Sequence, residues 1–122
     1  GDDMVPNSDK TVREAQEEAF PDLTSRMVNA SLDETAEMVR VILRDMDMEL
    51  LDETLTDDGW LIEAAYTSRW FGFIDDFVVR LTPEGPRTRV DVRSKSRVGG
   101  SDLGANAARV RAFFEKLESA AS

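Results

Sequence analysis

The feature of this sequence that most limits its fold is an alternation of apolar and charged side chains along residues 60–98. Successive side chains of a β-strand point to opposite faces of the sheet, so the alternation predicts strands with one apolar and one charged face. The apolar positions that share a face are Phe77, Val79, Leu81, Val90 and Val92. The charged positions opposite them are Arg80, Arg89, Asp91, Arg93, Lys95 and Arg97. We therefore expect helices to cover the apolar face alone.

Four strands can be placed in this part of the chain, at residues 48–56, 60–68, 75–82 and 88–98. Turn-forming residues lie at two of the three junctions between these strands, at positions 57–59 and 83–86. The connections are short and contain no helix, which predicts an antiparallel meander. A further, weaker strand is expected before them, at residues 26–30.

The first helix is predicted from its start signal and its apolar stripe. Ser31 and Glu34 have the spacing of a capping box, in which each side chain bonds to the backbone of the other residue. Apolar residues then recur at helical spacing as far as Met46. This pattern predicts a helix at residues 32–45.

The second helix is expected after the glycine pair that ends the last strand. Ser101 is a suitable N-cap, and Asp102 lies in the first turn, where the helix dipole favours an anion. Apolar residues at spacings of four and three predict a helix at 102–118. The predicted fold is α+β, a four- or five-stranded antiparallel sheet with two helices packed on one face.

Composition limits the chemistry that this chain can perform. Histidine and cysteine are both absent, which removes the commonest general base, the thiolate nucleophile and the commonest transition-metal ligands. We expect no cofactor and no metal site, and an enzyme is the least favoured class because no ordinary nucleophile–base pair can be assembled.

Charge is unevenly distributed along the chain. The net charge of −10 argues against nucleic acid as a partner. Residues 80–111 nevertheless contain eight basic residues and three acids, which gives this window +5 and leaves −15 for the rest. The two parts either neutralise each other across the folded sheet or steer a charged partner.

The length of 122 residues corresponds to one domain. Residues 1–19 are polar and acidic and are interpreted as a flexible N-terminal arm, and residues 20–119 as the single α+β domain. No apolar run approaches the length of a membrane span. Because the chain begins with Gly1 and not with methionine, we also expect that a targeting or membrane segment can precede it.

Two stretches of the chain resemble a known bacterial family. They are EAAYTSRWFGFIDD at residues 63–76 and VDVRSKSRVGGSDLGANA at residues 90–107, with FPD at residues 20–22 similar to the family's beginning. This combination resembles the domain of unknown function 1499 over residues 20–117. The resemblance implies no activity, and it implies that members are often exported or carry an N-terminal membrane segment.

The first candidate site is the segment that leads from the last strand into the second helix. Its residues are Arg93, Lys95, Arg97, Gly99, Gly100 and Ser101. Basic side chains beside the amides of a helix N-terminus suit phosphate, sulfate or a carboxylate. The alternative is that Arg93 and Arg97 pair with nearby acids and that the glycines only allow a tight turn.

The second candidate is the pair Asp75 and Asp76. Adjacent strand residues point to opposite faces, so the two carboxylates are not expected to chelate one ion, and one is expected to pair with an arginine. Structural roles are assigned to both of them and to Arg80, Asp102, Gly104 and Asn106. The Asn106 amide is expected to bond to the loop at residues 97–100 and hold it.

The third candidate is an aromatic segment between the second and third predicted meander strands. Trp70, Phe71 and Phe73 surround a glycine and form either an exposed docking tip or a lid on one end of the core. The leading hypothesis for function is a non-catalytic binding module in the cell envelope, for a partner protein (a membrane-associated one included) or a small anion. The alternative is a structural appendage of a larger membrane protein.

Overall fold

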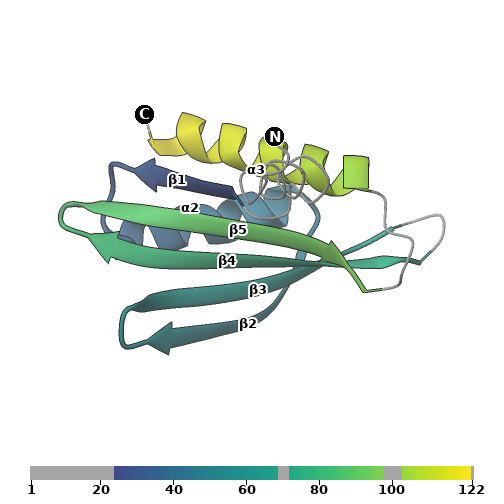
Figure 1. Ribbon diagram of the computed structural model, residues 1–122, viewed down its shortest axis with the longest axis horizontal. Helices are drawn as coiled ribbons and strands as arrows, with labels where there is room; N and C mark the ends of the chain where they lie inside the picture. Colours follow the sequence, from purple (N-terminus) through teal and green to yellow (C-terminus); the bar gives the residue numbers. More distant parts are fainter. Residues whose placement is uncertain (1–23, 69–71, 98–102, 122) are drawn as a thin grey trace, which may run out of the picture.

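The computed structural model describes residues 24–68, 72–97 and 103–121. In this part of the chain a five-stranded antiparallel sheet packs against two helices (Figure 1). The elements are β1 (Thr24–Val28), α2 (Leu32–Asp45), β2 (Glu49–Thr56), β3 (Gly59–Thr67), β4 (Ile74–Glu84), β5 (Arg87–Ser96) and α3 (Leu103–Ala121). The order of strands across the sheet is β1-β5-β4-β3-β2, so the meander predicted from the sequence is confirmed and β1 is added beside β5.

Both helices lie on the face that carries the apolar residues. Helix α3 contacts β1 and β5, helix α2 contacts β2 to β5, and the two helices contact each other. In Figure 1, α2 passes behind β5 while α3 runs alongside β1. The opposite face of the sheet, which bears the charged residues of β4 and β5, is called the open face below.

The core is formed where the apolar residues of adjacent strands fall into register beneath the helices. Ile62, Val79 and Val92 pair across β3, β4 and β5 and are fully buried. Phe77 packs against Phe113 of α3, with ring centroids 5.3 Å apart. The alternation along residues 60–98 thus sorts side chains between the core and the open face, as predicted.

The predicted first strand was misplaced by two residues. It was expected at residues 26–30, whereas β1 runs from Thr24 to Val28. The chain must leave the sheet before Ser31, because the Ser31 side chain accepts a hydrogen bond from the Glu34 amide and caps α2. The predicted bounds of α2 are confirmed, since the capping box and the apolar stripe specify the same helix.

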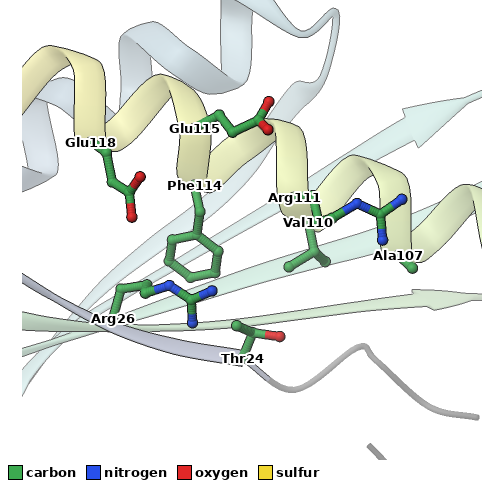
Figure 2. A pocket seen from close by; sticks show the side chains of 8 residues that line it. All are labelled: Thr24, Arg26, Ala107, Val110, Arg111, Phe114, Glu115 and Glu118. Carbon is green, nitrogen blue, oxygen red and sulfur yellow. The ribbon is translucent and has the colours of Figure 1, made fainter. Parts of the chain in front are cut away.

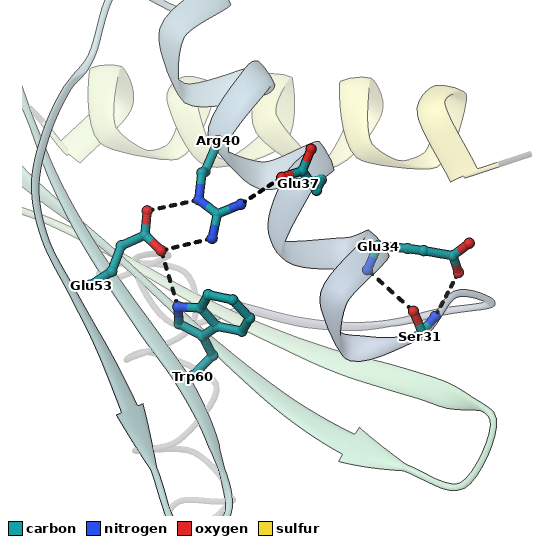
Figure 3. A network of polar contacts seen from close by, with 6 residues as sticks. All are labelled: Ser31, Glu34, Glu37, Arg40, Glu53 and Trp60. Carbon is teal, nitrogen blue, oxygen red and sulfur yellow. Dashed lines mark hydrogen bonds and ion pairs between the residues drawn. The ribbon is translucent and has the colours of Figure 1, made fainter.

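The outer strand β2 is tied to α2 by one polar cluster (Figure 3). The Arg40 guanidinium donates to both carboxylate oxygens of Glu53, at 2.8 and 3.0 Å, and lies over the Trp60 ring with 5.1 Å to its centroid. The Trp60 indole N–H also donates to Glu53, at 3.1 Å. Beside this cluster the register of β2 on β3 shifts between Leu50 and Asp52, which forms a β-bulge.

This cluster predicts a loss of stability in acid. Hydrogen bonding to Arg40 lowers the pKa of Glu53, so its contribution is present above the unfolded-state pKa and is lost as the pH falls through the folded-state value. At pH 7, Glu53→Gln should lower the free energy of unfolding by about 2 kcal/mol, as expected for hydrogen bonds to a charged group. Urea unfolding at pH 7 and pH 3 measures the difference, which should shrink at pH 3; an equal difference at both would contradict this account.

Candidate binding surface

The open face gathers three cations around Asp91, and a fourth follows them along β5. In the β4–β5 register Arg80 lies opposite Asp91, and Arg89 and Arg93 lie two residues to either side of Asp91 on the same face. Lys95 continues the row, and all four basic side chains are exposed. Diagonal neighbours on a sheet face are about 7–8 Å apart, which makes Arg89 and Arg93 the like-charged neighbours of Arg80, whereas Lys95 lies opposite Asp76. Arg80, Arg89, Arg93 and Lys95 are called the basic patch below.

The acids next to the basic patch compensate part of its charge. Arg89 pairs with Glu84 at 3.3 Å and with Asp91 at 3.2 Å. Asp91 also accepts a hydrogen bond from the Ser25 hydroxyl of β1. Exposed pairs of this kind contribute at most about 1 kcal/mol each. By formal charge, the four cations of the patch outnumber Glu84 and Asp91.

Arg97, directly after β5, is held by an acid of the neighbouring strand. Its guanidinium contacts the Asp76 carboxylate at 2.9 Å, and its backbone N–H donates to the Ile74 carbonyl at 3.0 Å. The hydrogen bond to Asp76 raises the pKa of Arg97 above its ordinary value. For Arg97 the structure therefore shows the ion pair that the sequence left as an alternative to anion binding.

The open face as a whole is divided by charge. On β4, β5 and the residue after β5, six cations face three acids; the cations are Arg80, Arg87, Arg89, Arg93, Lys95 and Arg97, and the acids are Asp76, Glu84 and Asp91. On β2 and β3 the charged residues of this face are Glu49, Asp52 and Glu63. One half of the face is thus net positive, although the chain carries −10 overall.

A closed polar ring lies on the opposite, helix-covered side at the start of α3. Arg109 pairs with Asp75 at 2.9 Å, with only 13% and 14% of the two side chains exposed. Asp75 also accepts from the Ser96 hydroxyl at 2.7 Å, and Ser96 accepts from the Asn106 amide at 3.3 Å. Arg109 closes the ring by donating to the Asn106 carbonyl oxygen at 3.2 Å.

Two further residues pack on this ring. The Ser94 hydroxyl donates to Asn106 at 2.6 Å, and the Arg109 guanidinium lies over the Tyr66 ring, 4.3 Å from its centroid. The ring thereby joins α3 to β3, β4 and β5. Its carboxylate is neutralised and its hydroxyls are bonded within the protein, so its evident role is to fix the start of α3 on the sheet.

Asn106→Ala should lower the free energy of unfolding by about 2 kcal/mol, because Asn106 is 3% exposed and its loss leaves Ser94 without its acceptor. Thermal and urea unfolding measure the loss, with Ala108→Ser on the exposed side of the same helix as a control. An unchanged melting temperature for Asn106→Ala would contradict the structural role assigned to this residue.

A shallow groove runs between β1 and α3 (Figure 2). Its volume is about 280 Å³, and it is lined by Thr24, Arg26, Ala107, Val110, Arg111, Phe114, Glu115 and Glu118. The Arg26 guanidinium covers the Phe114 ring at 5.1 Å from its centroid. We call this the β1–α3 groove.

The structure brings together only part of the residues predicted as sites. Gly99, Gly100, Ser101 and Asp102 of the proposed anion site, and Trp70 and Phe71 of the aromatic segment, lie outside the described residues. Phe73 is 54% exposed. Gly104 is exposed in the first turn of α3.

The two aspartates point to opposite faces, as predicted from their adjacency. Asp75 enters the polar ring and Asp76 lies on the open face beside Arg97. The partner of Asp75, Arg109, was missed because the rotation of α3 over the sheet cannot be read from periodicity. Within residues 24–68, 72–97 and 103–121, no three acidic side chains gather in a way that would hold a metal ion.

Comparison with known proteins gives a family and no activity. Neither helix of the described residues combines the length and apolar character that crossing a bilayer requires. None of the curated proteins compared with the chain matches it. A family described as "Protein of unknown function (DUF1499)" matches residues 3–117, which takes in most of the segment interpreted as an N-terminal arm. Over this length the resemblance noted in two stretches of sequence becomes a match, and the chain belongs to the DUF1499 family.

Proposed function

We propose that this protein is a non-catalytic binding module that takes an anionic partner on the basic half of its open face. The observation that carries the proposal is the convergence of Arg80, Arg89, Arg93 and Lys95 on one uncovered sheet face of an acidic protein. Like charges placed side by side on a sheet destabilise the fold, and a bound anion relieves that repulsion.

The spacing of the patch suits carboxylates carried on an extended chain. Arg93 and Lys95 are two residues apart on β5, which corresponds to about 6.6 Å along a strand. An extended peptide with glutamate at every second position repeats its charge at the same interval. We place the module in the cell envelope, on the family resemblance alone.

Catalysis has less support than binding. The carboxylate that lies deepest beside other polar groups, Asp75, is held by Arg109 and Ser96. Both oxygens of this carboxylate are therefore engaged by donors of the protein itself. The role of appendage to a larger membrane protein is compatible with the same surface, which would then dock the parent protein.

Titration of the isotope-labelled full chain tests the proposal by NMR. The probes are an eight-residue peptide with alternating glutamate and serine, and inorganic phosphate. Saturable shift changes at Arg80, Arg93 and Lys95 that weaken with added salt are expected. Shift changes with the peptide but not with phosphate would indicate a protein partner. Shift changes of equal size with phosphate would indicate a small anion.

Matched charge variants distinguish the effect of the basic patch on affinity from a general effect of net charge. Arg80→Gln with Lys95→Gln should lower peptide affinity about tenfold, which corresponds to about 1.4 kcal/mol. Arg44→Gln with Arg111→Gln removes the same charge from exposed positions on the helices. This control should change the peptide affinity less than about twofold. Equal losses in both variants, or no shift on β4 and β5 with either probe, would overturn the proposal.

A further inference from the structure

The open face carries opposite charges at its two sides. On β5 it presents Arg89, Arg93 and Lys95, and all three side chains are exposed. On the edge strand β2 it presents Glu49 and Asp52, which are exposed as well. β4 and β3 separate the two strands, so the positive and negative sides lie about 14 Å apart. The acids of β2 are therefore neither direct nor diagonal neighbours of the cations of β5.

The bulge in β2 is what brings both of its acids to the open face. Glu49 and Asp52 are three residues apart, a separation that in a regular strand directs side chains to opposite faces. The register shift between them instead pairs them with Ala65 and Glu63 of β3, which are two residues apart on one face. The two carboxylates thus acquire the spacing of neighbouring cations on β5.

The strand register aligns these charges in rows that cross the sheet. Three consecutive cross-strand rows of the open face join β5 to β2: Lys95 with Glu49, Arg93 with Asp52, and Asp91 with Thr54. A two-fold axis parallel to the strands, between β3 and β4, lays β5 of one copy over β2 of another and keeps each row in place. Each cation then faces a carboxylate, and the acid on β5 faces a hydroxyl group.

We propose that the anionic partner of the basic patch is a second copy of this chain, bound face to face about this two-fold axis. Lys95 pairs with Glu49 of the partner subunit, and Arg93 pairs with Asp52 of the partner subunit. Because the interface is isologous, each pair occurs twice. This inference rests on the proposed function, since it names the partner of the same surface.

The size and the centre of the open face suit such a dimer. Strands β2 to β5 are 8 to 11 residues long and cover roughly 600 Å² per copy. The total of about 1,200 Å² is the lower limit for a specific, stable interface. Leu61 and Val78, half-buried in one chain, flank the axis and supply its apolar centre. Two copies of net charge −10 repel each other, so we expect a dissociation constant in the micromolar range.

Sedimentation of charge-reversed full chains tests the pairing. Lys95→Glu and Glu49→Lys each create two like-charged contacts and should raise the dissociation constant of the dimer about tenfold. Glu49→Lys also lowers the net negative charge, so general repulsion alone would strengthen its dimer. Mixing the two variants restores opposite charges at both contacts and should recover an affinity within about threefold of the unaltered chain's. Arg44→Glu, an exposed reversal on α2, is the control and should change the constant less than about twofold.

The outcomes separate this inference from the proposed function. A chain that sediments as a monomer up to about 1 mM, or variants that do not recover on mixing, would overturn the dimer. Saturable peptide shifts on β4 and β5 of that monomer would leave the proposed function in place. A monomer that binds neither peptide nor phosphate would overturn both proposals.

Discussion

Asp75→Ala is expected to lower the free energy of unfolding by about 3–5 kcal/mol, the largest effect of any single substitution considered for this protein. The reason is the charge of Arg109, which stays in place when Asp75 is removed. The Arg109 guanidinium is 13% exposed, and removing Asp75 leaves its charge under α3 without the carboxylate that neutralises it. Ser96 loses its acceptor in the same substitution. Urea unfolding at neutral pH measures the loss.

A double substitution shows whether the ion pair or its burial is responsible. Replacing both partners with apolar residues, Asp75→Leu with Arg109→Met, removes the uncompensated charge and should recover most of the loss. Arg97→Met, at the exposed pair with Asp76, should cost less than about 1 kcal/mol. A loss of similar size for Asp75→Ala and Arg97→Met would show that the polar ring is not the anchor of α3.

Gly59→Ala is expected to cost about 3 kcal/mol, at the upper end of what overpacking usually costs. A β-carbon at position 59 would lie 2.0 Å from the carbonyl oxygen of Leu81 in β4. That oxygen belongs to the backbone of a central strand, so β3 and β4 would have to separate at the point where Trp60 pairs with Leu81.

Gly85→Ala is the matched control, since it also adds one methyl group to a glycine. Gly85 has a φ of +65°, but no atom lies within 4 Å of the place its β-carbon would take. Its cost is therefore conformational, about 1–2 kcal/mol for an alanine in the left-handed region. Thermal unfolding of both variants should rank Gly59→Ala as the less stable; the reverse order would contradict the close approach of β3 and β4.

The strands and helices were largely predictable because neighbouring residues determine them. The alternation along residues 60–98 specified which side chains enter the core, and the row from Arg89 to Lys95 is uncovered as expected. The capping box at Ser31 specified the start of α2. Each of these signals is complete within a few consecutive residues.

The polar ring could be predicted only in part, because it depends on contacts distant in sequence. One of the two aspartates was expected to pair with an arginine, and both do: Asp76 with Arg97, and Asp75 with Arg109, 34 residues away on α3. Asn106 was expected to bond to the loop after β5, and the described structure shows it bonded to Ser94 and Ser96 of the strand itself. These choices depend on how α3 is rotated on the sheet, which side-chain periodicity does not specify.

The bulge in β2 has a consequence for how far the sheet can grow. β2 is an edge strand with exposed leucines at positions 50, 51 and 55, a composition that invites polymerisation with identical molecules. The bulge at Leu51 breaks the even row of backbone groups that an incoming strand would have to match. The charged side chains of Glu49 and Asp52 add like charge along this edge. The bulge therefore disfavours growth of the apolar edge of β2 into a fibril of stacked copies.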